Sequence, residues 1–373
     1  MTLVLQALMH DAGIKQCHLA EAAGISRPAL SALINHGGLP KRYDRAAVEN
    51  RITQHLHQCG VAKAKAKHWG NTQDNPEETT AMLLRKQTLT PQARRHFSLS
   101  ADPFTDPTTA DEVFLSPDIR YVRESLYQVA RHGGFLAMIG ESGAGKSTLR
   151  EELIDRIRRE EQSVIVIEPY VLAMEGTDAT GKTLRSQHIA EAIMAGVAPL
   201  AKTKSSPEAR FRQLHESLRD SSRAGHSHVL IIEEAHSLPL PTLKHLKRFR
   251  ELKDGLRQLL SVVLIGQPEL ALKLSEHNPE VREVVQRIEM VQLPTLGTHL
   301  EGYLAHRFKR LGMPLDKVLD RNAVDALRTK LTPSRGEGSL LYPLAVHNAL
   351  SAAMNRAADL GVPHVTADVV RGV

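Results

Sequence analysis

An eight-residue segment, Gly140 to Ser147, matches the phosphate-loop pattern G-x-x-x-x-G-K-S. It lies between an apolar run over 135–139 and a helix-like segment over 148–159. A strand must deliver such a loop, and a helix N-terminus must point its free N–H groups at the phosphates. The pattern therefore predicts a nucleotide site made of Gly140, Glu141, Ser142, Gly143, Ala144, Gly145, Lys146, Ser147 and Thr148. In this site Lys146 would reach the β- and γ-phosphates, and the Ser147 hydroxyl would ligate Mg²⁺.

A second segment, Gly176 to Thr183, matches the same pattern and includes Lys182. Pro169 interrupts the apolar run before it, and Asp178 would place a carboxylate against the phosphates. We therefore interpret this segment as a polar loop that caps the next helix, and we assign the nucleotide to the first loop.

A second apolar run, over 229–232, ends in Glu233 and Glu234. A nucleotide site that hydrolyses needs carboxylates at such a strand end. We assign Glu233 to Mg²⁺ through water, and Glu234 to the attacking water. Aspartate is usual at the first position, so the longer Glu233 side chain is a departure. The alternative is a pair of exposed glutamates with no chemical role.

Residues 16–35 have the spacing of a helix-turn-helix. Leu19 and Ala20 would pack the first helix, Gly24 would take a positive-φ turn, and Ser26 would cap the second helix. Arg27, Pro28, Ala29 and Ser31 are then expected near a DNA groove. A three-helix protein-interaction module of the same shape is the alternative.

The composition suits a polyanionic partner, because the 373-residue chain has a formal charge of +6 and a pI near 9.3. Two cysteines, Cys17 and Cys59, exclude a disulfide framework and favour a reducing compartment. The sequence has no apolar run of membrane-span length and no signal-peptide pattern, so we expect a cytoplasmic protein. We expect a helix-turn-helix domain over 1–60 and a polar linker over 61–101.

Several motifs together resemble the AAA+ ATPases related to the general secretion pathway A protein: Asp102-Pro103-Phe104, the phosphate loop, Glu233-Glu234-Ala235-His236 and Gly266-Gln267-Pro268. With its helix-turn-helix, the whole chain looks more like the transposition ATPases of Mu-like phages, the B proteins. The resemblance implies an α/β fold with a parallel sheet over 102–296 and a helical lid over 297–373. It also implies ATP and Mg²⁺ as cofactors, and a ring or helical filament of copies on double-stranded DNA. Binding would be largely sequence-neutral, and the assembly would deliver target DNA to a transposase.

The same resemblance assigns roles to further residues. Gln267, at the end of an apolar run over 260–266, would sense the γ-phosphate, while Arg282 or Arg287 would reach the nucleotide of a neighbouring subunit. A surface arginine without such a role is the alternative for either one. Many lids of this family carry an arginine before a late helix, but residues 338–343 have none, and Arg335 is the nearest cation.

Two basic surfaces are candidates for DNA contact. One is a helix with a buried stripe from Leu243 to Leu256, which carries Lys244, Lys247 and Arg248 together with Arg250, Lys253 and Arg257. The other contains Lys182 and Arg185. Solvated charge is the alternative for both surfaces. Two rival functions also stay open: a secretion-associated ATPase, and a helix-turn-helix regulator that holds ATP only as a ligand.

Overall fold

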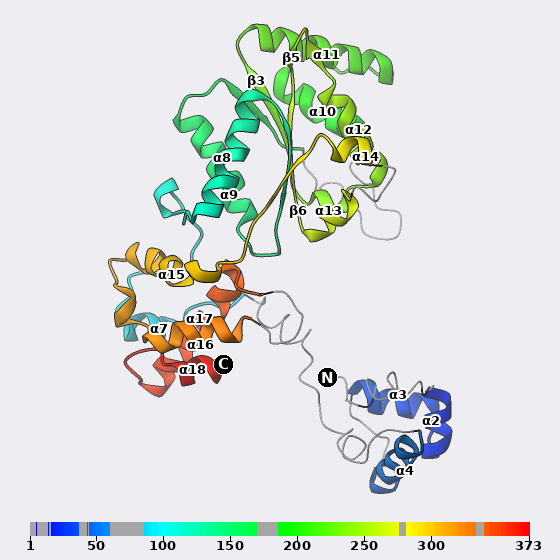
Figure 1. Cartoon of the computed structure of the whole chain (residues 1–373), viewed down its shortest axis with the longest axis vertical. Coiled ribbons are helices and arrows are strands. Elements are labelled where there is room, and N and C mark those ends of the chain that lie inside the picture. The colour runs from blue at the N-terminus through cyan, green and yellow to red at the C-terminus, as the bar shows by residue number, and fades with distance from the viewer. Residues whose placement is uncertain are drawn as a thin grey trace. The chain divides into compact units, whose positions relative to one another are not determined.

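The computed structural model describes residues 5, 14, 16–36, 43, 45–59, 86–169, 186–275, 281–332 and 339–373. The chain divides into two compact units, residues 1–85 and residues 86–373. Each unit has a hydrophobic core of its own (Figure 1).

The first unit is helical: α2 is Gln16–Ala23, α3 is Arg27–His36 and α4 is Arg45–Gln58. The chain turns between α2 and α3 at Gly24, whose φ is +64°, and the Ser26 hydroxyl accepts a hydrogen bond from the Ala29 N–H at 3.4 Å. Leu19, Leu30 and Ile34 are fully buried. The structure confirms the predicted pair of helices and its turn. The expectation that Ala29 lies near a DNA groove was wrong. Ala29 is 4% exposed and packs in the core.

A five-stranded parallel sheet forms the centre of the second unit, in the order β2-β3-β6-β1-β7. The strands are β1 (Phe135–Ile139), β2 (Val164–Ile167), β3 (Ser227–Ile232), β6 (Ser261–Gly266) and β7 (Glu289–Gln292). β1, β3 and β6 lie inside the sheet, and the apolar runs that predicted them are buried on both faces, as parallel strands require. The α/β fold class with a parallel sheet is confirmed.

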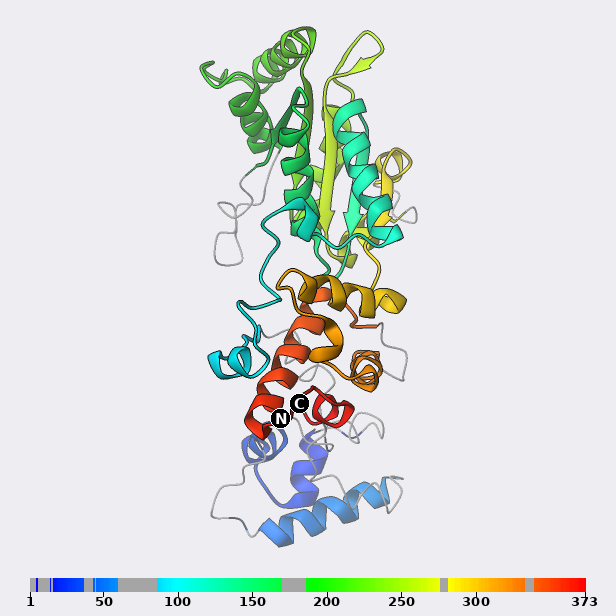
Figure 2. The ribbon, with the colours of Figure 1, turned by 90° about the vertical axis from the view of Figure 1, so that its left-hand side faces the viewer.

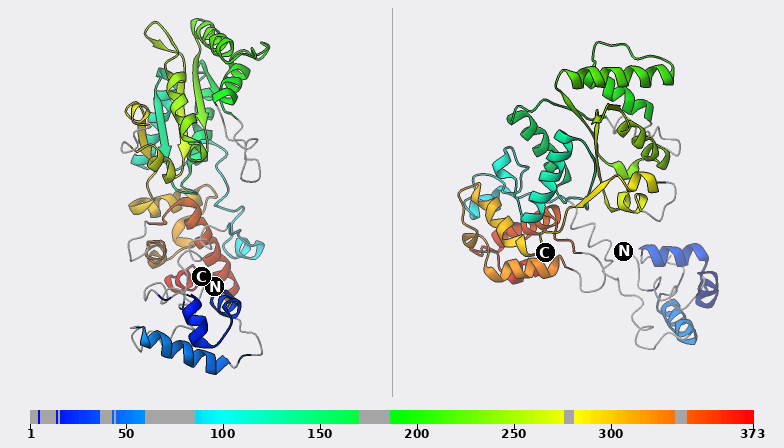
Figure 3. Two further views of the ribbon diagram at one scale, coloured as in Figure 1. Left: turned by 90° about the vertical axis from the view of Figure 1, so that its right-hand side faces the viewer. Right: turned by 45° about the horizontal axis from the view of Figure 1, so that its top comes forward.

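Helices cover both faces of this sheet, as the right-hand view of Figure 3 shows. Leu136 and Met138 of β1 face a cluster with helices α8 (Pro117–His132) and α9 (Lys146–Arg159). Phe135, Ala137 and Ile139 face the opposite cluster. That cluster contains α10 (Ser186–Val197), α11 (Pro207–Arg223), α12 (Leu240–Arg250), α13 (Pro268–Lys273) and α14 (Arg282–Val285).

Helix α12 is shorter than the apolar spacing indicates. Leu243, Leu246 and Phe249 are buried as predicted, but the helix ends at Arg250. The chain then forms a hairpin of β4 (Lys253–Asp254) and β5 (Arg257–Gln258), with Gly255 at φ +63° in its turn. Leu256 lies at the tip and is fully exposed, so its assignment to the buried stripe was wrong.

A helical lid adjoins the end of the sheet where the parallel strands finish (Figure 2). It consists of α15 (Leu300–Lys309), α16 (Arg321–Lys330), α17 (Pro343–Leu360) and α18 (Ala367–Arg371). Short 3₁₀ helices complete the described elements: η1 (Ala110–Glu112), η3 (Ala235–Ser237), η4 (Gly297–His299) and η5 (Leu315–Lys317).

The segment before the sheet also packs on the lid. Helix α7 (Pro91–His96) lies against α17, and the N–H groups of Gln87 and Thr90 donate to the side-chain oxygens of Asn348 and Asn355, both at 2.9 Å. A polar linker was expected to extend to residue 101. Residues 86–101 are instead folded onto the lid, and residues 61–85 lie outside the described part of the chain.

Within the described ranges, no helix is long and apolar enough to cross a membrane.

Candidate nucleotide-binding site

The phosphate loop connects β1 to α9, as predicted. Gly143 and Gly145 have φ values of +75° and +97°, a region that L residues with side chains rarely adopt. These turns leave the first N–H groups of α9 at the open end of the loop, where a phosphate would bind. Leu344 of the lid closes one side: its N–H donates to the Gly143 carbonyl at 3.2 Å, and a Cβ at Gly143 would overlap the Leu344 side chain.

Lys146 is the buried cation of the loop. It is 9% exposed, and its Nζ donates to the carbonyl oxygens of Gly140 at 2.8 Å and Glu141 at 2.9 Å. Burial lowers the pKa of Lys146, and surrounding carboxylates, Glu234 first among them, oppose this effect. The loop thus holds an ammonium group beside its free amides, in the arrangement that a polyphosphate requires.

The oxygens assigned to Mg²⁺ lie side by side. The Ser147 hydroxyl donates to Glu233 Oε1 at 3.4 Å, although the two residues are 86 positions apart. A hydroxyl and a carboxylate at this spacing fit the all-oxygen ligand set that Mg²⁺ prefers. The longer Glu233 side chain has a fixed position, because Arg150 of α9 donates to its Oε2 at 2.8 Å and also lies 3.3 Å from Glu168.

His236 lies between Glu234, which follows β3, and the backbone of Gln267, which follows β6. Glu234 has a left-handed backbone, with φ +47°, and one carboxylate oxygen lies 3.4 Å from Nε2 of His236. The Gln267 N–H donates to Nδ1 of the same imidazole at 3.4 Å. His236 therefore connects the residue assigned to the attacking water with the residue assigned to γ-phosphate sensing.

A cavity of about 380 Å³ brings these groups together. Its lining includes residues 142–149, Glu234 and Gln267, and also the lid residues Tyr303, Arg307 and His347. None of these three lid residues was predicted from the sequence. A signal for Arg307 was present, since it occupies a position on the buried stripe Leu300, Tyr303, Leu304, Arg307 and Phe308, where a charged residue is unusual.

The lid side of the cavity is largely uncharged apart from Arg307. Burial raises the pKa of Tyr303 to about 12, and burial together with Arg307 lowers the pKa of His347 to about 3. Both groups are therefore neutral near pH 7, and they share a hydrogen bond. Arg307 is 3% exposed and donates to the Thr105 carbonyl, while its Nε has no partner among the described residues. It is a buried cation at the edge of a nucleotide cavity.

Comparison with known proteins agrees with this geometry: residues 129–274 match the family model described as an AAA domain. The chain contains an AAA-type phosphate-loop ATPase domain.

Similarity to individual known proteins is distant. The general secretion pathway protein A of Aeromonas hydrophila is 25% identical over 236 residues, which cover 58% of this chain and 37% of that protein. The chain thus matches little more than a third of this relative's length.

Solved structures with a similar fold include ORC2 of Aeropyrum pernix with ADPNP and ADP, which is 17% identical. That match covers 72% of this chain and 70% of the other, with a TM-score of 0.49. Cdc6p of Pyrobaculum aerophilum is 15% identical, over 73% and 68%, with a TM-score of 0.45. RuvB of Thermotoga maritima is 15% identical, over 72% of both chains, with a TM-score of 0.42.

The two arginines assigned to a neighbouring subunit lie on the surface of the AAA unit. Arg282 begins α14 and is exposed. The Arg287 side chain is 46% exposed, and its guanidinium lies 3.5 Å from Glu251. Neither is among the described residues that line the cavity of their own chain. Both are therefore available for contact with a second copy.

The predicted DNA contacts are separated by the structure. Arg27 is exposed at the start of α3, and Ser31 is half-buried on the same helix. On α12, Lys247 is ion-paired with Glu283 and Glu251, while Lys244 and Arg248 lie on the same short helix. Lys182 and Arg185, like Arg335 of the lid, lie outside the described residues.

Proposed function

We propose that the AAA domain hydrolyses ATP in the cavity between the phosphate loop and the lid. The observation that carries this proposal is the position of Glu234 and Gln267, which line the same cavity as residues 142–149. Lys146 and the first amides of α9 would hold the β- and γ-phosphates, and Ser147 and Glu233 would hold Mg²⁺. The metal ion, when bound, would neutralise charge on the phosphate oxygens.

In the proposed step, water attacks the γ-phosphorus and forms a new P–O bond. The bond to the β,γ-bridging oxygen breaks, which yields ADP and inorganic phosphate. Glu234 orients the water and accepts its proton, while Lys146 and the loop amides stabilise the charge that moves to the leaving diphosphate. The contact of His236 with Glu234 and with the Gln267 backbone would align the water with the γ-phosphate.

We further propose that ATP assembles copies of the chain on duplex DNA without strong sequence preference. The formal charge of +6 and the helix-turn-helix unit support a DNA partner, and the exposed Arg282 and Arg287 support a contact with a neighbouring subunit. Many weak phosphate contacts become one strong contact when the subunits are joined. Loss of the γ-phosphate would loosen the assembly, so the DNA would stay bound only until the ATP is hydrolysed.

The role that we propose for this assembly is delivery of target DNA to a transposase. This role rests on the resemblance to the B proteins of Mu-like phages and on the helix-turn-helix that precedes the ATPase core in the sequence. A strand-transfer assay tests it, with a purified transposase of the Mu-like phage type, a donor DNA and labelled target DNA. We expect product that depends on both ATP and this protein. Transfer that is unaffected by either one would refute the transposition role.

Electron microscopy with duplex DNA tests the assembly directly. We expect rings or filaments on the DNA with ATP and bare DNA without it. Binding to unrelated duplexes should be similar and should decline steeply as salt rises. Tight, ATP-independent binding to a single sequence, abolished by deletion of residues 1–60, would instead support a helix-turn-helix regulator.

A secretion-associated ATPase is the second candidate, and the similarity to general secretion pathway protein A favours it. Cell fractionation distinguishes the two functions. Recovery of the chain with membranes, together with the absence of DNA binding, would support the secretion role and exclude the role in transposition.

A further inference from the structure

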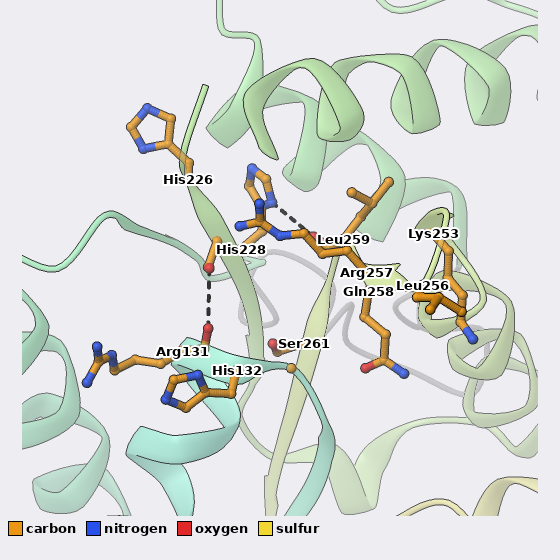
Figure 4. Close-up of a pocket in the computed structure, with 12 residues that line it drawn as sticks. Arg131, His132, His226, His228, Lys253, Leu256, Arg257, Gln258, Leu259 and Ser261 are labelled. Carbon is orange, nitrogen blue, oxygen red and sulfur yellow. Dashed lines mark hydrogen bonds between the residues drawn. The ribbon is translucent and has the colours of Figure 1, made fainter. Parts of the chain in front are cut away.

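A basic cavity lies at the end of the sheet opposite to the phosphate loop. It has a volume of about 460 Å³ and is lined by the end of α8, the starts of β3 and β6, and the β4–β5 hairpin. β1, β3 and β6 are parallel, so their amino ends meet here and their carboxyl ends meet at the phosphate loop. Figure 4 shows the lining residues around these strand starts.

The charges that line this cavity are of one sign. Arg131, Lys253 and Arg257 contribute three cations, His132 and His226 add imidazole groups, and no aspartate or glutamate is among the described lining residues. The nearest carboxylate of the hairpin, Asp254, is held by Arg223 through two hydrogen bonds of 2.9 and 3.0 Å. This bidentate pair lowers the pKa of Asp254 and neutralises its charge.

The cavity is built on a fixed frame. His228 is 2% exposed, and its ring nitrogens bond to the Leu259 carbonyl at 2.9 Å and to the Ser221 hydroxyl at 2.8 Å. The Arg257 side chain extends toward this ring (Figure 4), and its Nη1 donates to the Ser222 carbonyl at 3.2 Å. A guanidinium has five N–H donors, so this single bond leaves Arg257 able to bind an anion. Lys253 is exposed on the hairpin and has no ion pair within the described ranges.

We propose that this cavity binds backbone phosphates of duplex DNA, with Lys253 and Arg257 as its principal contacts. The inference rests on the DNA binding proposed above and gives it a location. The composition of the lining favours this ligand, because cationic side chains without neighbouring carboxylates bind backbone phosphates whatever the base sequence of the DNA. The candidate contacts on α12 are less suited, since Lys247 already pairs with Glu283 and Glu251.

The strands β3 and β6 connect this cavity with the residues that we assign to ATP hydrolysis. β3 begins at this cavity with Ser227 and ends before Glu233 and Glu234, and β6 begins with Ser261 and ends before Gln267. A phosphate bound at the starts of these strands is one strand length from the residues that act on ATP. A DNA contact at this cavity could therefore influence Glu234 and Gln267 through β3 and β6.

The test is a double substitution in the full chain, Lys253→Gln with Arg257→Gln. Binding to a fluorescent duplex is titrated over a range of KCl concentrations with a non-hydrolysable ATP analogue. We expect affinity to decrease about tenfold or more near 0.15 M salt. The slope of log K against log[KCl] should also become shallower by about 1.8 for each bound subunit, since each lost phosphate contact removes about 0.9.

Two further variants serve as controls. The pair Lys253→Arg and Arg257→Lys keeps the charges and should keep the slope; if its slope decreases equally, hairpin folding rather than charge is responsible, and the proposal is wrong. The pair Lys244→Gln and Lys247→Gln removes the same charge from α12 and should leave the slope unchanged. A shallower slope for the α12 pair alone would assign the DNA to α12.

The outcomes separate this inference from the proposed function. If the parent chain binds duplex DNA and the Lys253→Gln, Arg257→Gln pair binds it with the same affinity and slope, only the location is refuted. If the parent chain binds no duplex in the presence of the ATP analogue, the DNA function itself is refuted, and the location with it.

Discussion

The contact between Gly143 and Leu344 gives a prediction whose size follows from the geometry. Gly143→Ala forces a side chain into a backbone with φ +75°, at a cost of about 1 kcal/mol. The new methyl group would also overlap Leu344, and overpacking of this kind costs about 1–3 kcal/mol. We therefore expect the free energy of unfolding to decrease by about 2–4 kcal/mol, measured by urea titration with circular dichroism.

A matched control separates the two causes. Gly361 has a similar φ of +68°, but a Cβ there would meet no atom within 4 Å, so Gly361→Ala should cost only the backbone part. Adding Leu344→Gly to Gly143→Ala should recover the overlap part, with a coupling energy of about 1–3 kcal/mol, because the Cβ of Leu344 is the atom nearest to the new methyl group. The same pair should recover ATP affinity. Equal losses for Gly143→Ala and Gly361→Ala, or strictly additive effects of Gly143→Ala and Leu344→Gly, would refute the reasoning.

Three further predictions concern the nucleotide site. Lys146→Ala should abolish ATP binding in a fluorescence titration while Lys182→Ala retains it, and equal loss in both would contradict the choice of loop. Glu234→Gln should keep ATP bound but reduce phosphate release at least about 100-fold, because the amide preserves shape without a basic carboxylate. Arg282→Ala or Arg287→Ala should weaken ATP-dependent DNA binding more than deletion of residues 1–60 does; the reverse order would place the main DNA contact in the helix-turn-helix.

Local sequence patterns were sufficient for the phosphate loop and the strands around it. β1, β3 and β6 are buried on both faces, so each appears as a continuous apolar run, and the residues at their carboxyl ends must meet at one edge. For this reason the amino-acid sequence alone was enough to place Lys146, Glu233, Glu234 and Gln267 at one edge of the sheet, while their roles stay predictions.

Patterns that depend on distant contacts were not predictable in the same way. The leucine spacing continues past Arg250, but pairing of Lys253 with Gln258 diverts the chain into a hairpin. Residues 86–101 look polar, yet they fold onto the lid, where Leu89 and Phe97 are buried and Asn348 and Asn355, more than 260 positions away, accept N–H groups of the segment. Arg307 and His347 reach the nucleotide cavity only because the lid adjoins the strand ends, which no local pattern specifies.

The left-handed backbone of Glu234 lowers the stability of the fold at the residue that we assign to activation of water. A glutamate at φ +47° is strained by about 1 kcal/mol. Asparagine tolerates this conformation better, so an inactive Glu234→Asn variant should unfold at a higher temperature than the inactive Glu234→Gln variant, which loses the same charge but keeps the strain. The residue that would relieve the strain at this position cannot activate water, so the cost in stability is tied to the chemistry that we assign to Glu234.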